Sequence, residues 1–118
     1  MLIPFMTSEP RTYSVPYDVY FQLRRYSDKE RIPISTIARS FIEQFKADDP
    51  ELSRDDIEAL YKSLGRHEFV SLTVRLHPNV IDWIKAKAQK IGLPSGSPLV
   101  AYIIHKKLSE KAGGVSEI

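Results

Sequence analysis

The polar side chains best placed for specific contacts lie in the segment 71–76. Ser71, Thr73 and Arg75 alternate there with apolar residues. A period of two is typical of a β-strand with one buried face and one polar face. The residues expected to face inward are Leu72, Val74 and Leu76. Hydroxyl groups donate and accept hydrogen bonds, and a guanidinium offers a fixed fork of donors, so the outward face is suited to hydrogen bonding with a ligand.

Residue sets that would support catalysis or metal binding do not occur in the sequence. The chain has no cysteine, which excludes disulfides, thiolate nucleophiles, zinc fingers and iron-sulfur clusters. Its three histidines, His67, His77 and His105, lack the spacing of metal ligands. There is no glycine-rich phosphate loop and no nucleophile elbow. We therefore expect no enzyme activity, no metal site and no cofactor.

Length and composition indicate one globular domain. The chain has 118 residues, of which 42% are hydrophobic and 27% charged. Its longest apolar run, from Leu99 to Ile104, is far shorter than the roughly 18 residues of a membrane span. Residues 1–6 lack the features of a secretory signal. We expect no membrane partner and a cytoplasmic location, in the host cell if the protein is viral.

Charge divides the chain into three segments. The net charge of +2 is the sum of +1 over residues 1–45, −3 over residues 46–70 and +4 over residues 71–118. In the acidic middle segment, Ser53 followed by Asp56 resembles a capping box. We therefore predict an N-terminal unit (1–45), an acidic helical linker (46–70) and a C-terminal unit (71–118).

The two outer segments resemble each other when one is shifted by about 61 residues. Matching pairs are Val15 and Leu76, Val19 and Val80, Leu23 and Ile84, and Pro33 and Pro94. Each unit is predicted to form one strand followed by two helices. The strand of the first unit is predicted at about Arg11 to Val15 and is less regular than that of the second.

The second predicted helix of each unit has a wide apolar face. Ser35 is expected to cap this helix in the first unit; Ser97 is expected to cap it in the second, with Pro98 at the first helical position. The apolar faces are Ile37, Ala38, Phe41, Ile42 and Phe45, and Leu99, Val100, Ile103, Ile104 and Leu108. One strand cannot satisfy its own backbone hydrogen bonds, so each unit needs a partner. We predict a mainly α fold in which the two strands pair as a short antiparallel ribbon over four interlocked helices.

A strand, two helices and a Ser- or Gly-marked turn before an apolar second helix resemble the ribbon-helix-helix family of DNA-binding regulators. Residues 70–108 carry most of the resemblance and residues 11–45 the rest, about two thirds of the chain together. The tandem form is similar to that of archaeal virus transcriptional regulators. The resemblance implies two ribbon-helix-helix units in one intramolecular pseudo-dimer. It also implies a sequence-specific regulator that binds double-stranded DNA and is able to self-associate on it.

In this family the ribbon enters the major groove and its outward side chains contact base edges. By position, the base-contacting residues would be Thr12, Ser14, Ser71, Thr73 and Arg75. The Arg75 guanidinium would suit guanine O6 and N7. Arg11 falls on the core-facing parity, and we retain it as a contact that requires either an unpaired position or a bulge.

The same family holds the DNA backbone with amides at the start of each unit's second helix, where the helix dipole also favours phosphate. The matching positions are Ser35 and Thr36 in the first unit, and Gly96 and Ser97 in the second. Pro98 removes one amide from the second of these helix starts.

Two other interpretations remain open. In the first, residues 88–92 are the turn of a helix-turn-helix motif and residues 98–108 its recognition helix; this places an apolar helix in the groove. In the second, the chain is a protein-interaction module, antitoxin-like or an adaptor, that docks a partner through residues 1–6 or the linker helix.

Overall fold

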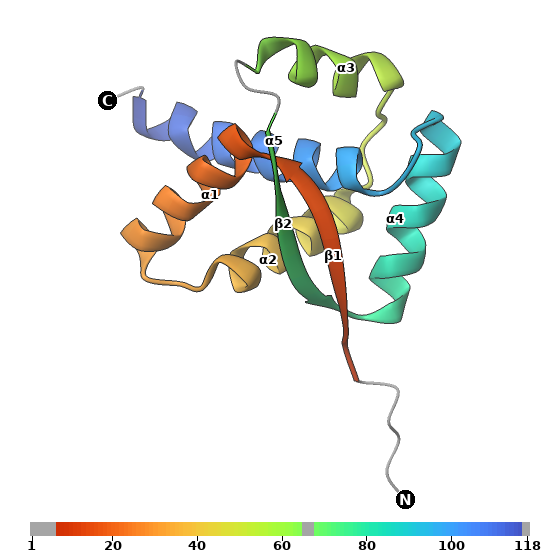
Figure 1. Cartoon of the computed structure of the whole chain (residues 1–118), viewed down its shortest axis with the longest axis horizontal. Helices are drawn as coiled ribbons and strands as arrows, with labels where there is room; N and C mark the ends of the chain where they lie inside the picture. Colours follow the sequence, from red (N-terminus) through yellow and green to blue (C-terminus); the bar gives the residue numbers. More distant parts are fainter. Residues whose placement is uncertain (1–6, 65–67, 117–118) are drawn as a thin grey trace, which may run out of the picture.

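The chain is mainly helical and has one two-stranded antiparallel sheet (Figure 1). This computed structural model describes residues 7–64 and 68–116. Its elements are β1 (Glu9–Pro16), α1 (Tyr17–Glu30), α2 (Ile34–Asp48), α3 (Arg54–Ser63), β2 (Phe69–Leu76), α4 (Pro78–Ile91) and α5 (Ser97–Ser116). The predicted fold class, mainly α with a short antiparallel ribbon, is confirmed at this level.

The ribbon pairs β1 with β2 along the full length of both strands. Thr12 lies opposite Thr73 near the middle, and the ladder runs from Glu9 opposite Leu76 to Pro16 opposite Phe69. Both strands begin two residues earlier than predicted, because cross-strand pairing extends them beyond the regular alternation. β1 contains two prolines, which a two-stranded ribbon accepts because each strand has one unpaired edge.

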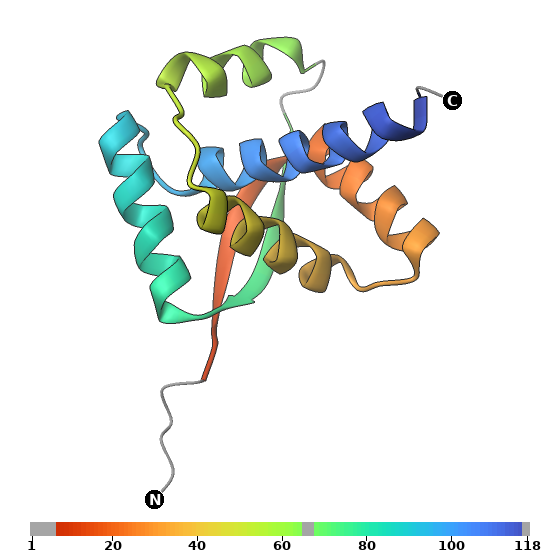
Figure 2. The same ribbon diagram turned by 180° about the vertical axis from the view of Figure 1, so that it is seen from behind.

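The helices cover only one face of the ribbon. In Figure 1 the strands lie in front of α2 and α5, whereas Figure 2, from behind, shows these helices in front of the strands. α2 packs against β2, and α5 packs against β1. The second helix of each segment thus lies beneath the strand that the other segment contributes, and α1 and α4 flank the ribbon.

The core contains the apolar faces predicted from periodicity. All ten predicted face residues of α2 and α5 are buried, as are the three inward residues of β2. Leu99, Ile103 and Ile104 have no exposed surface, so the apolar face of α5 is completely covered there. α3 adds Ile57 and Leu60 to the buried set and packs against α5.

The ends of α1 and α4 match at the predicted spacing of 61 residues. Tyr17 and Pro78 begin these helices, and Arg31 and Gly92 cap their C-terminal ends in the left-handed conformation, with φ of 60° and 92°. At each helix end, the amide that follows the cap donates to the carbonyl five residues earlier. These bonds run from Ile32 to Ser27 and from Leu93 to Ala88. This bond pattern is that of a Schellman-type helix end.

Two of the predicted caps are wrong, and a third is confirmed. α2 begins at Ile34, one residue before Ser35, because the turn after Arg31 has only two residues. Pro33 therefore takes the cap position, and no side chain bonds to the helix start. In α5 the first helical bond runs from the Val100 amide to the Gly96 carbonyl, so Gly96 rather than Ser97 is the cap. Ser53 and Asp56 form the predicted capping box at the start of α3.

A polar contact joins the end of α2 to α4. Asp49 caps α2 in the left-handed conformation, and its Oδ1 accepts hydrogen bonds from Lys87 Nζ at 2.8 Å and from Trp83 Nε1 at 3.3 Å. Lys87 Nζ also donates to the Pro50 carbonyl, and its side chain is only 11% exposed. Lys87 therefore belongs to this contact between helices and is not a free surface cation.

Candidate functional site

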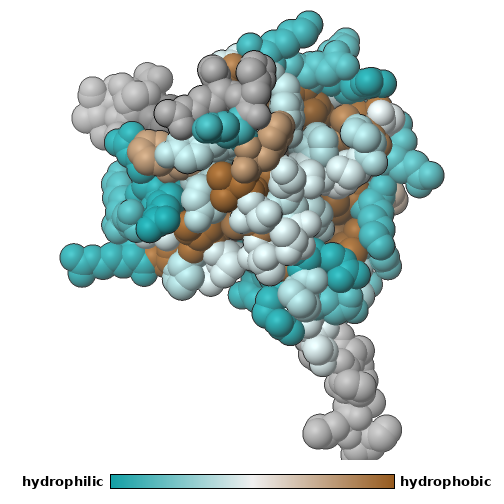
Figure 3. Space-filling model, in the orientation of Figure 1, coloured by the Kyte–Doolittle hydropathy of each residue, from teal (hydrophilic) through white to brown (hydrophobic). Residues whose placement is uncertain are grey.

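The face of the ribbon that the helices leave uncovered carries the predicted polar residues. Five of the predicted base-contacting residues point to this face, and all five are exposed: Thr12, Ser14, Ser71, Thr73 and Arg75. Pairing of the two strands brings them together. We call these five residues and Phe69 the ribbon face. At its middle, the Thr12 and Thr73 hydroxyl groups share a hydrogen bond of 2.8 Å. In the view of Figure 3 a pale, weakly polar band occupies the middle of this side of the molecule.

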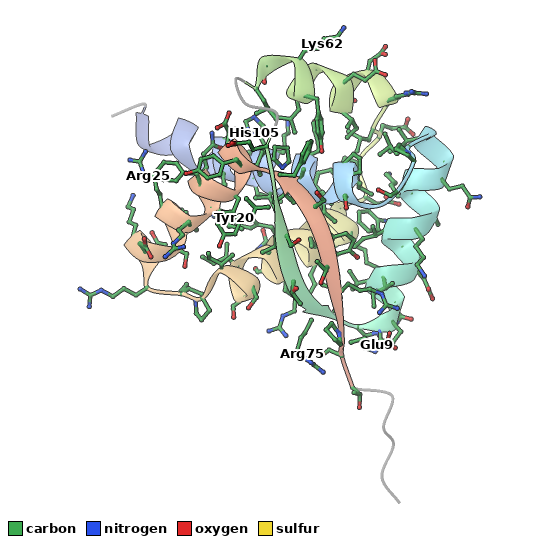
Figure 4. All side chains as sticks on the ribbon, viewed as in Figure 1. Glu9, Tyr20, Arg25, Lys62, Arg75 and His105 are labelled. Atoms are coloured by element: carbon green, nitrogen blue, oxygen red, sulfur yellow. The ribbon has the colours of Figure 1, made fainter. Side chains whose placement is uncertain are left out.

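Arg75 lies at the end of the ribbon where β1 begins, near Glu9 (Figure 4). Its Nε donates to Ser8 Oγ at 3.2 Å and its Nη2 donates to the Ser8 carbonyl at 2.9 Å. These bonds use two of the five guanidinium N–H donors, both on one edge of the group. The edge formed by Nη1 and Nη2 remains available for a bidentate contact with a ligand.

Arg11 lies on the other side of the ribbon from Arg75. It pairs opposite the buried Val74, and its Nη2 forms an ion pair of 3.2 Å with Glu9. β1 is paired at this position and the register runs without a bulge, so neither condition under which Arg11 would share the ribbon face is met. The structure places Arg11 apart from the other candidate base contacts.

Phe69 is a member of the ribbon face that the sequence analysis missed. It begins β2, has the parity of Ser71, Thr73 and Arg75, and is 55% exposed. The signal was present, because extending the alternation of residues 71–76 back by two positions reaches Phe69. An exposed aromatic ring at the end of an otherwise hydroxyl-rich face provides an apolar contact surface.

The starts of α2 and α5 lie on opposite sides of the ribbon (Figures 1 and 2). Ser35 and Thr36 are exposed in the first turn of α2, which has no side-chain cap. The Thr36 amide already donates to the Pro33 carbonyl at 3.1 Å, whereas the helical amides before it lack partners within the helix and attract anions. The predicted phosphate positions of the first unit are therefore accessible.

The start of α5 is already bonded within the protein. The Ser97 hydroxyl accepts the amide of Ser14 in β1 at 2.9 Å, and the Ser97 amide donates to Ser95 Oγ at 3.3 Å. A Cβ added at Gly96 would lie 2.8 Å from Ile84 Cγ2 and 3.3 Å from Tyr13 Cε1. Gly96 and Ser97 thus hold α5 against β1, and Pro98 contributes no amide.

No family model, curated protein or solved structure matches this chain. What it binds is therefore inferred from the chemistry of the ribbon face and the helix starts.

Titratable groups do not gather at this face. Burial lowers the pKa of His105 in α5, and its Nδ1 has no hydrogen-bond partner among the described residues. Burial raises the pKa of Tyr13 beneath the ribbon. His77 accepts the Asn79 amide at the start of α4, and His67 lies outside the described residues.

The described part of the chain offers neither a metal site nor a membrane span. Residues 7–64 and 68–116 contain no cluster of three or more metal-ligating side chains. In the same residues, no helix is both long and apolar enough to cross a membrane. The ribbon face offers groups for hydrogen bonding and for apolar contact.

Proposed function

We propose that this chain is a sequence-specific regulator of transcription that binds double-stranded DNA through the ribbon face. The observation that carries the proposal is an uncovered two-stranded ribbon whose outward residues are hydroxyl side chains, an arginine and an aromatic ring. The major groove admits a two-stranded ribbon, and its base edges offer matching donors, acceptors and thymine methyl groups.

The proposal includes two ribbon-helix-helix units related by a pseudo-twofold axis, and two features of the ribbon and its helices support it. Thr12 and Thr73 are equivalent in the repeat, since they are 61 residues apart, and they also lie opposite each other in the ribbon. Where a twofold axis between two units crosses a ribbon, it places equivalent residues of the two strands opposite each other. The exchange of partners, α2 on β2 and α5 on β1, follows from the same axis.

The charge distribution is compatible with an anionic partner on this side. Arg75 is the charged member of the ribbon face. The acidic residues of α3 belong to the opposite end of the molecule, where Figure 4 places Lys62 of that helix, far from Arg75. The exposed α2 start at Ser35 and Thr36 would position a phosphate beside the ribbon, which fixes register without reading sequence.

The helix-turn-helix interpretation agrees less well with this packing. Its recognition helix would be residues 98–108, yet Leu99, Val100 and Ile103 of that stretch have no exposed surface. Placing this helix in a groove would require the core to open. Binding through the exposed ribbon face requires no such opening of the core.

A protein-interaction role is the second candidate, and a specific surface favours it. Phe21 on α1 is 47% exposed, its ring stacks on Tyr17 with centroids 6.0 Å apart, and Arg25 lies over it at 5.9 Å. Exposed aromatic and arginine side chains are enriched at protein interfaces. Such a surface is compatible with DNA binding by the same chain.

Gel-shift titrations and footprinting test the proposal. The wild-type chain is first offered a pool of random duplexes, and the selected duplex is compared with random DNA. Arg75→Ala should weaken binding to the selected duplex by about 1–3 kcal/mol and change binding to random DNA little. Arg11→Ala is the matched control, because it removes an arginine from the same end of the ribbon but from the other face.

Equal, weak binding of every duplex by wild type and Arg75→Ala would contradict sequence readout by the ribbon. A larger loss in Arg11→Ala than in Arg75→Ala would contradict the assignment of the faces.

A further inference from the structure

The ribbon face has different chemistry at its two ends. Arg75 and the exposed Pro10 opposite it form one end; Phe69 forms the other, where the residue opposite, Pro16, is buried. The Thr12–Thr73 pair lies between these ends. One end therefore carries a guanidinium with three N–H donors that Ser8 does not engage, and the other carries an aromatic ring that is 55% exposed.

The repeat does not restore symmetry. The residue equivalent to Arg75 in the first unit is Ser14, and the residue equivalent to Phe69 is Ser8, each 61 positions earlier. A palindromic duplex offers the same base contacts in both halves. A ribbon with one arginine and one phenylalanine is not complementary to that arrangement.

We infer that the chain reads a non-palindromic duplex site with a guanine at the Arg75 end and a thymine at the Phe69 end. The inference rests on the proposed function. With one edge of its guanidinium held by Ser8, Arg75 presents the Nη1–Nη2 edge, which matches guanine O6 and N7. A phenylalanine ring has no hydrogen-bonding group and suits the thymine C5-methyl group.

The length of β2 limits the spacing of the two bases. Arg75 and Phe69 are six residues apart, about 20 Å at the antiparallel rise of roughly 3.4 Å per residue. Base pairs stack at about 3.4 Å along the helix axis, so a ribbon of this length places the two bases at most about six pairs apart. Between them, the hydroxyl groups of Thr12, Ser14, Ser71 and Thr73 face the intervening pairs.

The test begins with selection of the full-length chain on random duplexes. The expected motif is asymmetric, with guanine and thymine within this spacing. In that duplex, replacing the guanine by 7-deazaguanine should weaken wild-type binding about 5- to 100-fold. Replacing the thymine by deoxyuridine should weaken it about fourfold, the factor for burying one methyl group.

The variants assign each base to a residue. Arg75→Ala should become insensitive to 7-deazaguanine but stay sensitive to deoxyuridine, and Phe69→Ala should show the reverse pattern. Arg11→Ala and Phe21→Ala are the matched controls and should keep both sensitivities. Phe69→Gln repeats the test with a larger side chain if Phe69→Ala does not fold.

Orientation is tested with a single cysteine, since the natural chain has none. Glu9→Cys carrying an iron chelate should cleave the duplex only at the guanine end, because Glu9 lies at the Arg75 end of the ribbon (Figure 4).

Three outcomes would overturn the inference. They are a palindromic motif, equal cleavage at both ends, and retained 7-deazaguanine sensitivity in Arg75→Ala. All three leave DNA binding intact, whereas failure to select any duplex would contradict the proposed function itself.

Discussion

At the residue scale, the backbone at Gly96 lies so close to the side chains of Ile84 and Tyr13 that a larger residue does not fit there. The Cβ of an alanine at Gly96 would meet Ile84 Cγ2 at 2.8 Å, and Ile84 is only 1% exposed. The surrounding core leaves the Ile84 side chain little room to move. This glycine therefore lets α5 approach α4 and the Tyr13 ring.

We expect Gly96→Ala to lower the free energy of unfolding by about 1–3 kcal/mol through overpacking. Chemical denaturation followed by circular dichroism measures the change. Ser95→Ala in the same loop is the control; it removes the exposed hydrogen bond from the Ser97 amide but overpacks nothing, so the loss should be smaller. An unchanged midpoint for Gly96→Ala would show that the approach of α5 is looser than described.

Arg31 occupies a backbone conformation that glycine adopts in the equivalent position of the other segment. Its φ is 60°, and Gly92 at the end of α4 has a φ of 92°. The left-handed conformation costs a non-glycine residue about 1–2 kcal/mol, part of which is offset by the greater freedom of glycine in the unfolded chain.

Arg31→Gly should therefore raise the free energy of unfolding by about 0.5–1 kcal/mol. Lys29→Gly, two positions earlier in right-handed helix, should instead lower it by about 1 kcal/mol. Thermal and urea unfolding of the two variants measures both effects. A loss of stability in Arg31→Gly would mean that the arginine side chain contributes more than its backbone conformation costs.

At the element scale, the contact of Asp49 with Lys87 and Trp83 couples the end of α2 to α4. The hydrogen bond from Lys87 is the first cause that lowers the pKa of the Asp49 carboxyl, and the bond from Trp83 is the second. Because the folded-state pKa lies below the unfolded value, the carboxylate stabilises the fold above about pH 4. This stabilisation is lost as the pH falls through the lowered pKa.

Asp49→Asn tests this coupling while keeping a residue that tolerates the left-handed conformation. At pH 7 the variant should be less stable than wild type, and the difference should shrink as the pH falls below about 4. Urea unfolding between about pH 3 and pH 7 measures it. Asp28→Asn, at an exposed carboxyl near the end of α1, is the control. A stability difference between wild type and Asp49→Asn that is the same at every pH would contradict an electrostatic role.

At the scale of the whole molecule, one chain supplies both strands of the ribbon. In a regulator assembled from two chains, folding is coupled to association, so the unfolding temperature rises with protein concentration. Here β1 and β2 pair within the chain and share one core with α2 and α5.

The unfolding temperature should therefore not change over about a hundredfold range of protein concentration. Differential scanning calorimetry at both extremes, with sedimentation velocity at the lower one, measures this. A shift of several degrees, or a dimer that persists at the lower concentration, would indicate pairing between chains. The expected self-association on DNA is tested separately, by the same sedimentation experiment with duplex added.

The sequence by itself determined the local features of this protein. Period-two alternation identified the buried residues of β2, helical periodicity identified the buried faces of α2 and α5, and the shift of 61 residues matched the ends of α1 and α4. These patterns are readable because burial on one face imposes its period on neighbouring residues of the same element.

Only the tertiary structure decided which residues meet across elements. Strand register set Thr12 opposite Thr73 and runs without a bulge at Arg11, and packing of α5 on β1 engaged Ser97. Likewise, Lys87 of α4 meets its partner, Asp49, across a separation of 38 residues in the sequence. Such contacts depend on how distant segments align, and no local period in the sequence records that alignment.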